Sequence, residues 1–269
     1  MNGLDRAVFV VSSSAISIDQ GNLVIRKGKE QSEETRICLD QVGSLFVESP
    51  GVNLSSALLL ALGERNIPVL VMNGKHQPSL TMLPLFSNGQ TSGAVYDQLT
   101  WKSERKQEMA RVIVKNKLEL QRRVLASFDK AGAAALSDLI ANKDLLAIEG
   151  VCAKHYFSSL FGKSFVRGND DPTNAKLNYG YAILASMITC QIVSHGFLCQ
   201  LGIHHHCEGN PFNLTYDFIE PFRPIVDEFV KKSLSRDFNF PFKLEMAKIR
   251  EAKVHLDGKA YQLKDAITE

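Results

Sequence analysis

An acidic pair in the C-terminal half of the chain, Asp217 and Glu220, is the first candidate for chemistry. Residues three apart on a helix lie on one face, so the two carboxylates would be neighbours. Like charges held that close cost free energy unless a cation offsets them, and divalent cations prefer carboxylate oxygens. A run of three histidines, His204 to His206, stands upstream and could supply a nitrogen ligand. By themselves, such a pair and such a run are more often a solvated helix face and a solvated loop.

Glu149 is a second candidate because it is a lone charge in the apolar run Leu145–Ala153. A carboxylate in these surroundings is either exposed at a helix end or buried beside a partner, and the local sequence slightly favours exposure. Cys199 and Cys207 flank the histidines, but their spacing is not that of a zinc site. They are most simply a core cysteine and a loop cysteine.

A basic segment, residues 101–123, holds eight lysines or arginines against three glutamates. Such an excess is usually a solvated helix face, but in a DNA-binding protein it would follow the phosphates, because lysine and arginine displace condensed counterions. Two further arginines lie near the acidic candidates, where phosphate contact and structural ion pairing are equal alternatives. The candidate DNA-binding residues are therefore Arg105, Lys115, Arg122, Arg123, Arg167 and Arg223.

The elements that must position these residues change character along the chain, and the predicted fold class is α+β. A small β-rich domain is expected over residues 1–85, with a hairpin about Asp19–Asn22. The charged stretch Lys27–Arg36 is expected to be a loop or an exposed edge. Leu54–Arg65 has helical composition, and either Asn53 or Ser55 could cap that helix.

Residues 86–95 are rich in turn formers and are predicted to be a linker. The remainder, residues 96–269, is predicted to be a larger, all-helical catalytic domain. Pro221 and Pro224 must kink or split the last of its long helices. The other interruptions are expected at the loop Phe165–Asn174 and near Gly196. The predicted helices are Trp101–Val124, Ala131–Ile140, Leu145–Phe161, Ala175–Leu201 and Asn213–Leu234.

Length and composition indicate an ordinary globular chain in a reducing compartment. The 269 residues are 45% hydrophobic and carry a net charge of only +2, so any polyanion must be held by local patches. Five cysteines without a C-x-x-C pair argue against a disulfide framework. The first residues lack a basic segment followed by an apolar run, and the longest apolar segments are too short to cross a bilayer. We therefore expect a cytoplasmic protein.

Four segments, taken in order, resemble the motifs of the CRISPR-associated integrase family, Cas-one. The resemblance runs from about residue 8 to residue 230, and the wording of the last segment is most similar to type II systems. The matching segments are Pro50–Leu58 with Asn66–Val69, Ala147–Gly150 followed by Tyr156 and Phe157, Asp171–Tyr181, and Leu201–Pro224. For the family, the resemblance implies a metal-dependent endonuclease and integrase in antiviral adaptive immunity. It inserts short DNA fragments into a CRISPR array by attack of a 3′ hydroxyl on a phosphodiester.

Residue by residue, the resemblance places the catalytic metal ligands on Glu149, His205 and Glu220, with Asp217 as a possible additional acidic residue. Counting from Gly202 favours His205, although His204 or His206 could take its place. Many members have aspartate where this chain has Glu220, which keeps the charge and lengthens the arm. The metal implied is Mg²⁺ or Mn²⁺.

The same resemblance implies partners for this chain. They are double-stranded DNA in the form of prespacer and CRISPR repeat–leader, a second copy of the chain, a dimer of the small Cas-two subunit that bridges two homodimers, and other type II adaptation proteins. The N-terminal half, with apolar segments Ala57–Leu62 and Ile67–Met72, is the expected dimer contact, unless those segments form only the core of the domain. Two rival functions remain: a catalytically inactive DNA-binding scaffold of the same fold, and a small-molecule metal hydrolase.

Overall fold

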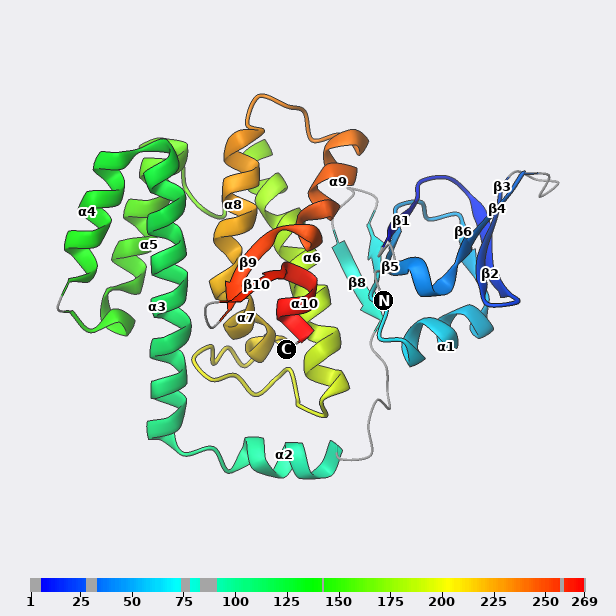
Figure 1. Ribbon diagram of the computed structural model, residues 1–269, viewed down its shortest axis with the longest axis horizontal. Coiled ribbons are helices and arrows are strands. Elements are labelled where there is room, and N and C mark those ends of the chain that lie inside the picture. The colour runs from blue at the N-terminus through cyan, green and yellow to red at the C-terminus, as the bar shows by residue number, and fades with distance from the viewer. Residues whose placement is uncertain are drawn as a thin grey trace. The chain divides into compact units, whose positions relative to one another are not determined.

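The computed structural model describes residues 6–27, 33–73, 78–82, 91–141, 143–256 and 259–268 (Figure 1). The chain divides into two units, one containing residues up to 94 with 189–197, and the other containing residues 95–188 with 198–267. A β-rich N-terminal region followed by a helical C-terminal region is the predicted α+β organisation, and the structure confirms it.

In the N-terminal unit, the described residues 6–82 form two four-stranded sheets with the helix α1. One sheet has the order β1-β5-β7-β8 and the other β4-β3-β2-β6. Aliphatic side chains from both sheets and from the helix α1 make a single core. The elements are β1 (Arg6–Val10), β2 (Ser14–Asp19), β3 (Asn22–Lys27), β4 (Glu33–Cys38), η1 (Leu39–Gln41), β5 (Val42–Val47), β6 (Val52–Leu54), α1 (Ser56–Glu64), β7 (Val69–Met72) and β8 (Pro78–Met82).

Local sequence explains the turns of this unit. Gln20 and Gly21 both have positive φ, which is the backbone of a two-residue turn suited to the twist of a hairpin, and β2 pairs antiparallel with β3 across it. The hairpin prediction is thus confirmed. Helix α1 begins after Ser55, whose hydroxyl accepts the N–H of Leu58, so Ser55 and not Asn53 is the cap. Within Lys27–Arg36, the described residues 33–36 belong to the edge strand β4.

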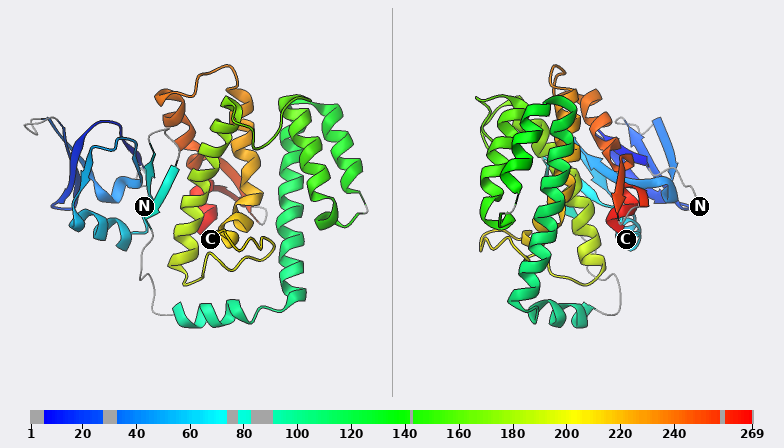
Figure 2. Two further views of the ribbon diagram at one scale, coloured as in Figure 1. Left: turned by 180° about the vertical axis from the view of Figure 1, so that it is seen from behind. Right: turned by 60° about the vertical axis from the view of Figure 1, so that its left-hand side comes forward.

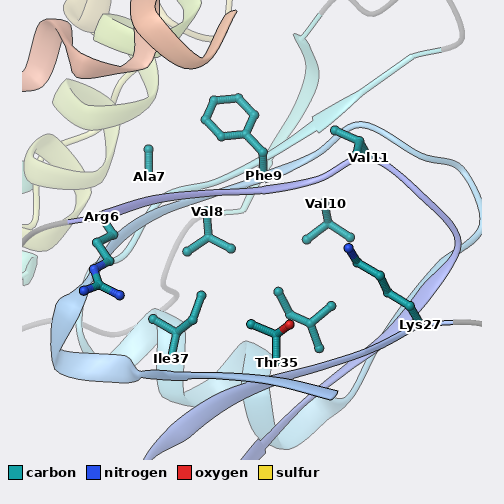
Figure 3. A pocket seen from close by; sticks show the side chains of 10 residues that line it. Arg6, Ala7, Val8, Phe9, Val10, Val11, Lys27, Thr35 and Ile37 are labelled. Atoms are coloured by element: carbon teal, nitrogen blue, oxygen red, sulfur yellow. The ribbon is translucent and has the colours of Figure 1, made fainter. Parts of the chain in front are cut away.

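A hollow of about 280 Å³ lies between the two sheets of this unit (Figure 3). Its walls are mostly aliphatic, with Arg6 and Lys27 as its charged residues. The ten lining residues include no carboxylate, histidine or cysteine. The hollow therefore offers no group suited to acid–base or metal chemistry.

Helices dominate the second unit, and α3, α4 and α5 pack side by side (Figure 2). The bounds are α2 (Thr91–Leu99), α3 (Ser103–Phe128), α4 (Lys130–Ile140), α5 (Leu145–Phe161), α6 (Pro172–Ser194), α7 (Asn213–Ile219), η2 (Glu220–Phe222), α8 (Arg223–Lys232), α9 (Phe240–Ala247), η3 (Lys248–Glu251), β9 (Lys253–Leu256), β10 (Lys259–Gln262) and α10 (Leu263–Thr268). Of the expected linker, residues 86–90 lie outside the described residues and residues 91–95 belong to α2.

Caps and prolines set the helix ends that matter for the site. Asp144 accepts the N–H of Leu146, so α5 begins at Leu145 as predicted. The last predicted long helix is split into α7, η2 and α8 because Pro221 and Pro224 have no N–H to donate. This split places Glu220 at a helix junction and not within a regular helix.

The prediction of an all-helical second domain is wrong at one place. Strands β9 and β10 form a two-stranded antiparallel hairpin near the C-terminus. Val254, His255, Ala260 and Tyr261 are among the paired residues. Each strand is only four residues long, which is too short for a reliable period-two pattern.

Candidate active site

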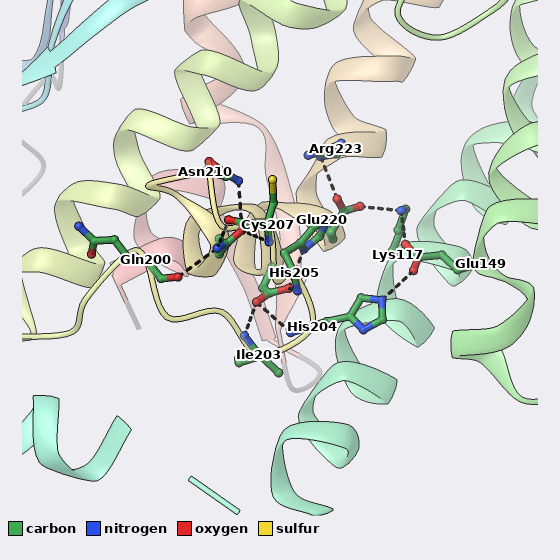
Figure 4. A network of polar contacts seen from close by, with 12 residues as sticks. Lys117, Glu149, Gln200, Ile203, His204, His205, Cys207, Asn210, Glu220 and Arg223 are labelled. Atoms are coloured by element: carbon green, nitrogen blue, oxygen red, sulfur yellow. Dashed lines mark hydrogen bonds and ion pairs between the residues drawn. The ribbon is translucent and has the colours of Figure 1, made fainter. Parts of the chain in front are cut away.

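A lysine and two carboxylates from separate elements meet at the centre of the helical unit (Figure 4). Lys117 on α3 places its Nζ 2.6 Å from Oε1 of Glu149 on α5 and 2.6 Å from Oε2 of Glu220 on η2. The side chains of the two glutamates are 18% and 5% exposed. Glu149 is therefore half-buried with a partner and not exposed at a helix end, which is closer to the alternative that the local sequence disfavoured.

Mutual attraction favours the charged forms of Lys117 and Glu149. Burial opposes ionisation of Glu149, but the Lys117 ammonium outweighs burial and lowers the pKa of that carboxyl. Burial likewise disfavours the ammonium of Lys117, yet Glu220 and Glu149 together raise its pKa. Arg223 adds a second cation, with its Nε 3.3 Å from Oε1 of Glu220. The site thus combines two carboxylates with two fixed positive groups.

Asp217 holds the histidine segment in place. Its carboxylate is buried and accepts the backbone N–H groups of Ile203, His204 and His205. It also contacts Nδ1 of His205 at 2.7 Å. Gly202 permits this close approach, because a Cβ there would lie 2.2 Å from the carbonyl oxygen of His205.

These contacts fix how His205 presents its ring. With Nδ1 bonded to a carboxylate, the other nitrogen of a neutral imidazole carries the lone pair, which is the arrangement of most metal-binding histidines. The hydrogen bond to Asp217 raises the pKa of His205 above its usual range, although burial acts the other way.

Asp217 therefore acts on His205. The prediction assumed that both carboxylates lie on one regular helix, and the structure departs from this at Glu220. Helix α7 ends at Ile219, and Glu220 begins the short 3-10 turn that contains Pro221. The two side chains consequently meet different partners.

His204 also reaches the cluster. Its Nε2 lies 3.5 Å from Oε2 of Glu149, and its ring centroid is 5.9 Å from that of His205. His206 is exposed. The geometry thus brings both His204 and His205 to the site and leaves His206 aside.

The donor set fits a hard divalent cation. Carboxylate oxygens with one imidazole nitrogen are ligands that Mg²⁺ and Mn²⁺ accept, and one positive atom already bridges Glu149 and Glu220. Among the residues that the structure describes, no three His, Cys, Asp or Glu side chains are already close enough together to hold a metal ion. At the site, the Lys117 ammonium stands between the two carboxylates.

An aromatic ring with two arginines lies next to Glu220. The guanidinium carbons of Arg223 and Arg167 lie 4.9 Å and 5.2 Å from the centre of the Tyr181 ring. Arg167 is held further by Asn174 and Asn178. Both arginines are partly exposed, so their outward N–H groups can meet a phosphate.

The remaining basic candidates lie on α3. Arg105 and Lys115 are exposed, whereas Arg122 and Arg123 both pair with Glu119, at 2.8 Å and 3.0 Å.

Two residues of the site, Lys117 and Tyr181, were not predicted from the sequence. The signal for Lys117 was its place within the apolar stripe of α3, where a surface lysine has no reason to stand.

The buried carboxylate of Asp227 accepts hydrogen bonds from Tyr156 and Tyr181. Burial raises the pKa of Asp227 to about 7, against these hydrogen bonds, which lower it. Because the folded pKa lies above that of the unfolded chain, the free energy of unfolding falls as the pH rises from about 4 to about 7.

We expect Asp227→Asn to remove this part of the pH dependence, because an amide does not ionise. Urea unfolding at pH 4.5 and pH 8 measures it: the wild type should lose about 3 kcal/mol more of its free energy of unfolding than the variant over that interval. Parallel losses in the two proteins would contradict the shifted titration of Asp227.

The comparisons with known proteins agree with this fold. The family model described as "CRISPR associated protein Cas1" matches residues 8–241. A CRISPR-associated endonuclease Cas1 of Neisseria meningitidis is 28% identical over 226 residues, covering 82% of this chain and 73% of its own length. A Cas1 endonuclease of Pyrobaculum aerophilum is 29% identical over 235 residues, covering 79% and 76%.

Solved structures share the same architecture. A casposase bound to its integration product superposes with a TM-score of 0.73 at 22% identity, covering 98% of this chain and 88% of that one. A CAS1 protein from Thermotoga maritima gives 0.70 at 16% identity, covering 97% and 93%. The β-rich unit followed by a helical unit is thus an architecture of CRISPR-associated proteins. The chain belongs to the Cas1 family.

Proposed function

We propose that this chain is a metal-dependent DNA integrase that inserts spacers into a CRISPR array. The observation that carries the proposal is that Glu149 and Glu220 come together from separate elements, with His204 3.5 Å from Glu149 and the adjacent His205 oriented by Asp217. The family membership and the names of the curated relatives, CRISPR-associated endonucleases, support it.

Glu149, His205 and Glu220 would hold Mg²⁺ or Mn²⁺ in this proposal. Such an ion, when bound, polarises a phosphoryl oxygen and stabilises the leaving oxygen of a phosphodiester transfer. The residues of the chain do the rest: Asp217 keeps Nδ1 of His205 protonated, and Arg223 stands beside Glu220, where a phosphate can be bound. The nucleophile is the 3′ hydroxyl of the incoming DNA, so no serine or cysteine is needed.

A strand-transfer assay tests the proposal. Labelled duplex and supercoiled plasmid are incubated with the protein in Mn²⁺, Mg²⁺ or EDTA, and joined product is measured. The proposal requires product with a metal and none in EDTA. DNA binding without product under every condition would instead identify the inactive scaffold.

DNA would follow the basic residues of α3 and the arginine pair at Tyr181. We expect neutralising Arg122 and Arg123 together to flatten the slope of log affinity against log salt by about two units, because each arginine that binds a phosphate contributes about one unit. Fluorescence anisotropy at several salt concentrations measures the slope. If the slope is unchanged, their pairing with Glu119 is their whole role.

Partners other than DNA are also part of the proposal. One structural neighbour is a Cas6-RT-Cas1–Cas2 complex, and another is a Cas1–DNA complex. We propose two homodimers bridged by a Cas2 dimer, in a type II system, with the N-terminal unit as the contact within each homodimer. No helix in the described part of the chain is long and apolar enough to cross a membrane.

The structure narrows the surface available for a dimer. Most of the apolar segments expected at the contact face inward, with Leu58, Leu62 and Val69 in the core of the unit. Leu60 on α1 is 69% exposed. We expect Leu60→Glu to shift the full-length chain from dimer toward monomer in light scattering, and an unchanged dimer would remove this face of α1 from the contact.

A further inference from the structure

Lys117 occupies an unusual place for a lysine. It stands on α3 among Val114, Leu118 and Gln121, all buried, and is itself 9% exposed. Lysine is almost never buried without a partner, because taking an ammonium out of water is costly. Packing alone therefore does not explain a lysine at this position.

The partners of Lys117 are the two glutamates of the proposed metal site, and the contacts take one oxygen from each. Oε1 of Glu149 and Oε2 of Glu220 both lie 2.6 Å from its Nζ. The other oxygens already face neighbours: Oε2 of Glu149 faces His204, and Oε1 of Glu220 faces Arg223. A metal ion bridging the two glutamates needs the oxygens that Lys117 now holds.

We propose that Lys117 is a resident cation that holds Glu149 and Glu220 together in the metal-free protein, and that a divalent metal binds by displacing its ammonium. The inference rests on the metal site of the proposed function. Without Lys117, the buried Glu220 and the half-buried Glu149 would repel each other, which destabilises the metal-free fold. With the competitor removed, the same carboxylates should bind a metal more tightly.

Thermal unfolding of the full-length chain is the first test of this inference. The variant is Lys117→Met, and the matched control is Lys115→Met, which removes an exposed lysine two positions away on the same helix. In EDTA we expect Lys117→Met to unfold roughly 5–10 °C below the wild type, as expected for breaking a buried ion pair. Saturating Mn²⁺ should close most of that gap, and Lys115→Met should follow the wild type throughout.

Isothermal titration with MnCl₂ gives the second readout. Lys117→Met should bind Mn²⁺ about tenfold more tightly than the wild type, because no ammonium has to be displaced. Equal or weaker binding would overturn the inference, as would a gap in unfolding temperature that is the same in EDTA and in Mn²⁺. Either result would make Lys117 a structural residue that the metal does not displace.

A double variant keeps the test decisive if Lys117→Met does not fold in EDTA. Adding Glu149→Gln removes one of the two negative charges, so the double variant should fold in EDTA and should gain little from Mn²⁺. A double variant as unstable as the single one would contradict the inference. Strand transfer by the wild type distinguishes failure of this inference from failure of the proposed function. If the wild type is active with metal but Lys117→Met does not bind Mn²⁺ more tightly, only the inference fails. If Lys117→Met binds Mn²⁺ more tightly but the wild type shows no strand transfer, only the proposed function fails.

Discussion

Glu220→Gln is expected to reduce strand transfer by at least about a thousandfold while the protein stays folded. Glutamine keeps the size of the side chain and removes the charge, so the loss of one carboxylate ligand is the main change. Glu220 is the less exposed of the two glutamates, with 5% of its side chain accessible, so water cannot easily replace it. Glu149→Gln is expected to behave in the same way. Joined product from labelled duplex and supercoiled plasmid measures both.

The matched control is Glu228→Gln on α8. Glu228 pairs with the exposed Lys232 one turn away, so its charge matters little to the site. The Glu228→Gln variant should retain strand-transfer activity within about twofold of the wild type, because a surface ion pair contributes little. Near wild-type activity of Glu220→Gln, with an unchanged circular dichroism spectrum, would remove Glu220 from the catalytic residues.

His205→Ala is expected to lower strand transfer by more than about a hundredfold, and Asp217→Asn by about 10- to 100-fold, since partners that orient a metal-binding histidine contribute on that scale. The reason is the hydrogen bond between Nδ1 of His205 and Asp217, which presents the other ring nitrogen. His206→Ala, the exposed neighbour, should leave activity nearly unchanged. Single-turnover rates at several Mn²⁺ concentrations measure all three.

The pH profile separates orientation of His205 from simple loss of structure. A metal binds the neutral imidazole, so activity should rise as the pH passes above the raised pKa of His205. Asp217→Asn removes the cause of that raised pKa, so the acidic limb of the activity profile of this variant should move to lower pH.

His204→Ala tests which histidine is the metal ligand, because His204 lies 3.5 Å from Glu149. If His204→Ala is inactive and His205→Ala is active, the ligand is His204.

Much of the architecture follows from patterns that one segment carries by itself. The hairpin about Gln20 and Gly21 and the bounds of α5 depend on local turn and cap chemistry, and both are as predicted. The split at Pro221 is equally local, because a proline acts on the helix that contains it. The β9–β10 hairpin could not be found in this way, since each strand is only four residues long, too short for an alternating pattern to be informative.

The candidate site, like the fold, could be predicted only in part from the sequence. Residue types alone pointed to the pair Asp217 and Glu220 and to Glu149 as a lone charge, and the resemblance to the family selected Glu149, His205 and Glu220. Neither could tell which oxygen meets which partner. The spacing of Asp217 and Glu220 suggested a shared cation, whereas the fold turns Asp217 toward the histidine segment. Lys117 was hidden because a lysine in a basic segment is usually solvated, and only packing of α3 against α5 and η2 shows its role.

The most direct test of the central claim is the metal dependence of strand transfer by the wild-type protein. Labelled duplex and supercoiled plasmid are incubated with Mn²⁺ or with EDTA, beside Glu149→Ala as the inactive reference. The proposed function requires joined product in Mn²⁺, none in EDTA and none from Glu149→Ala. Equal product in EDTA, or equal product from Glu149→Ala, would contradict it.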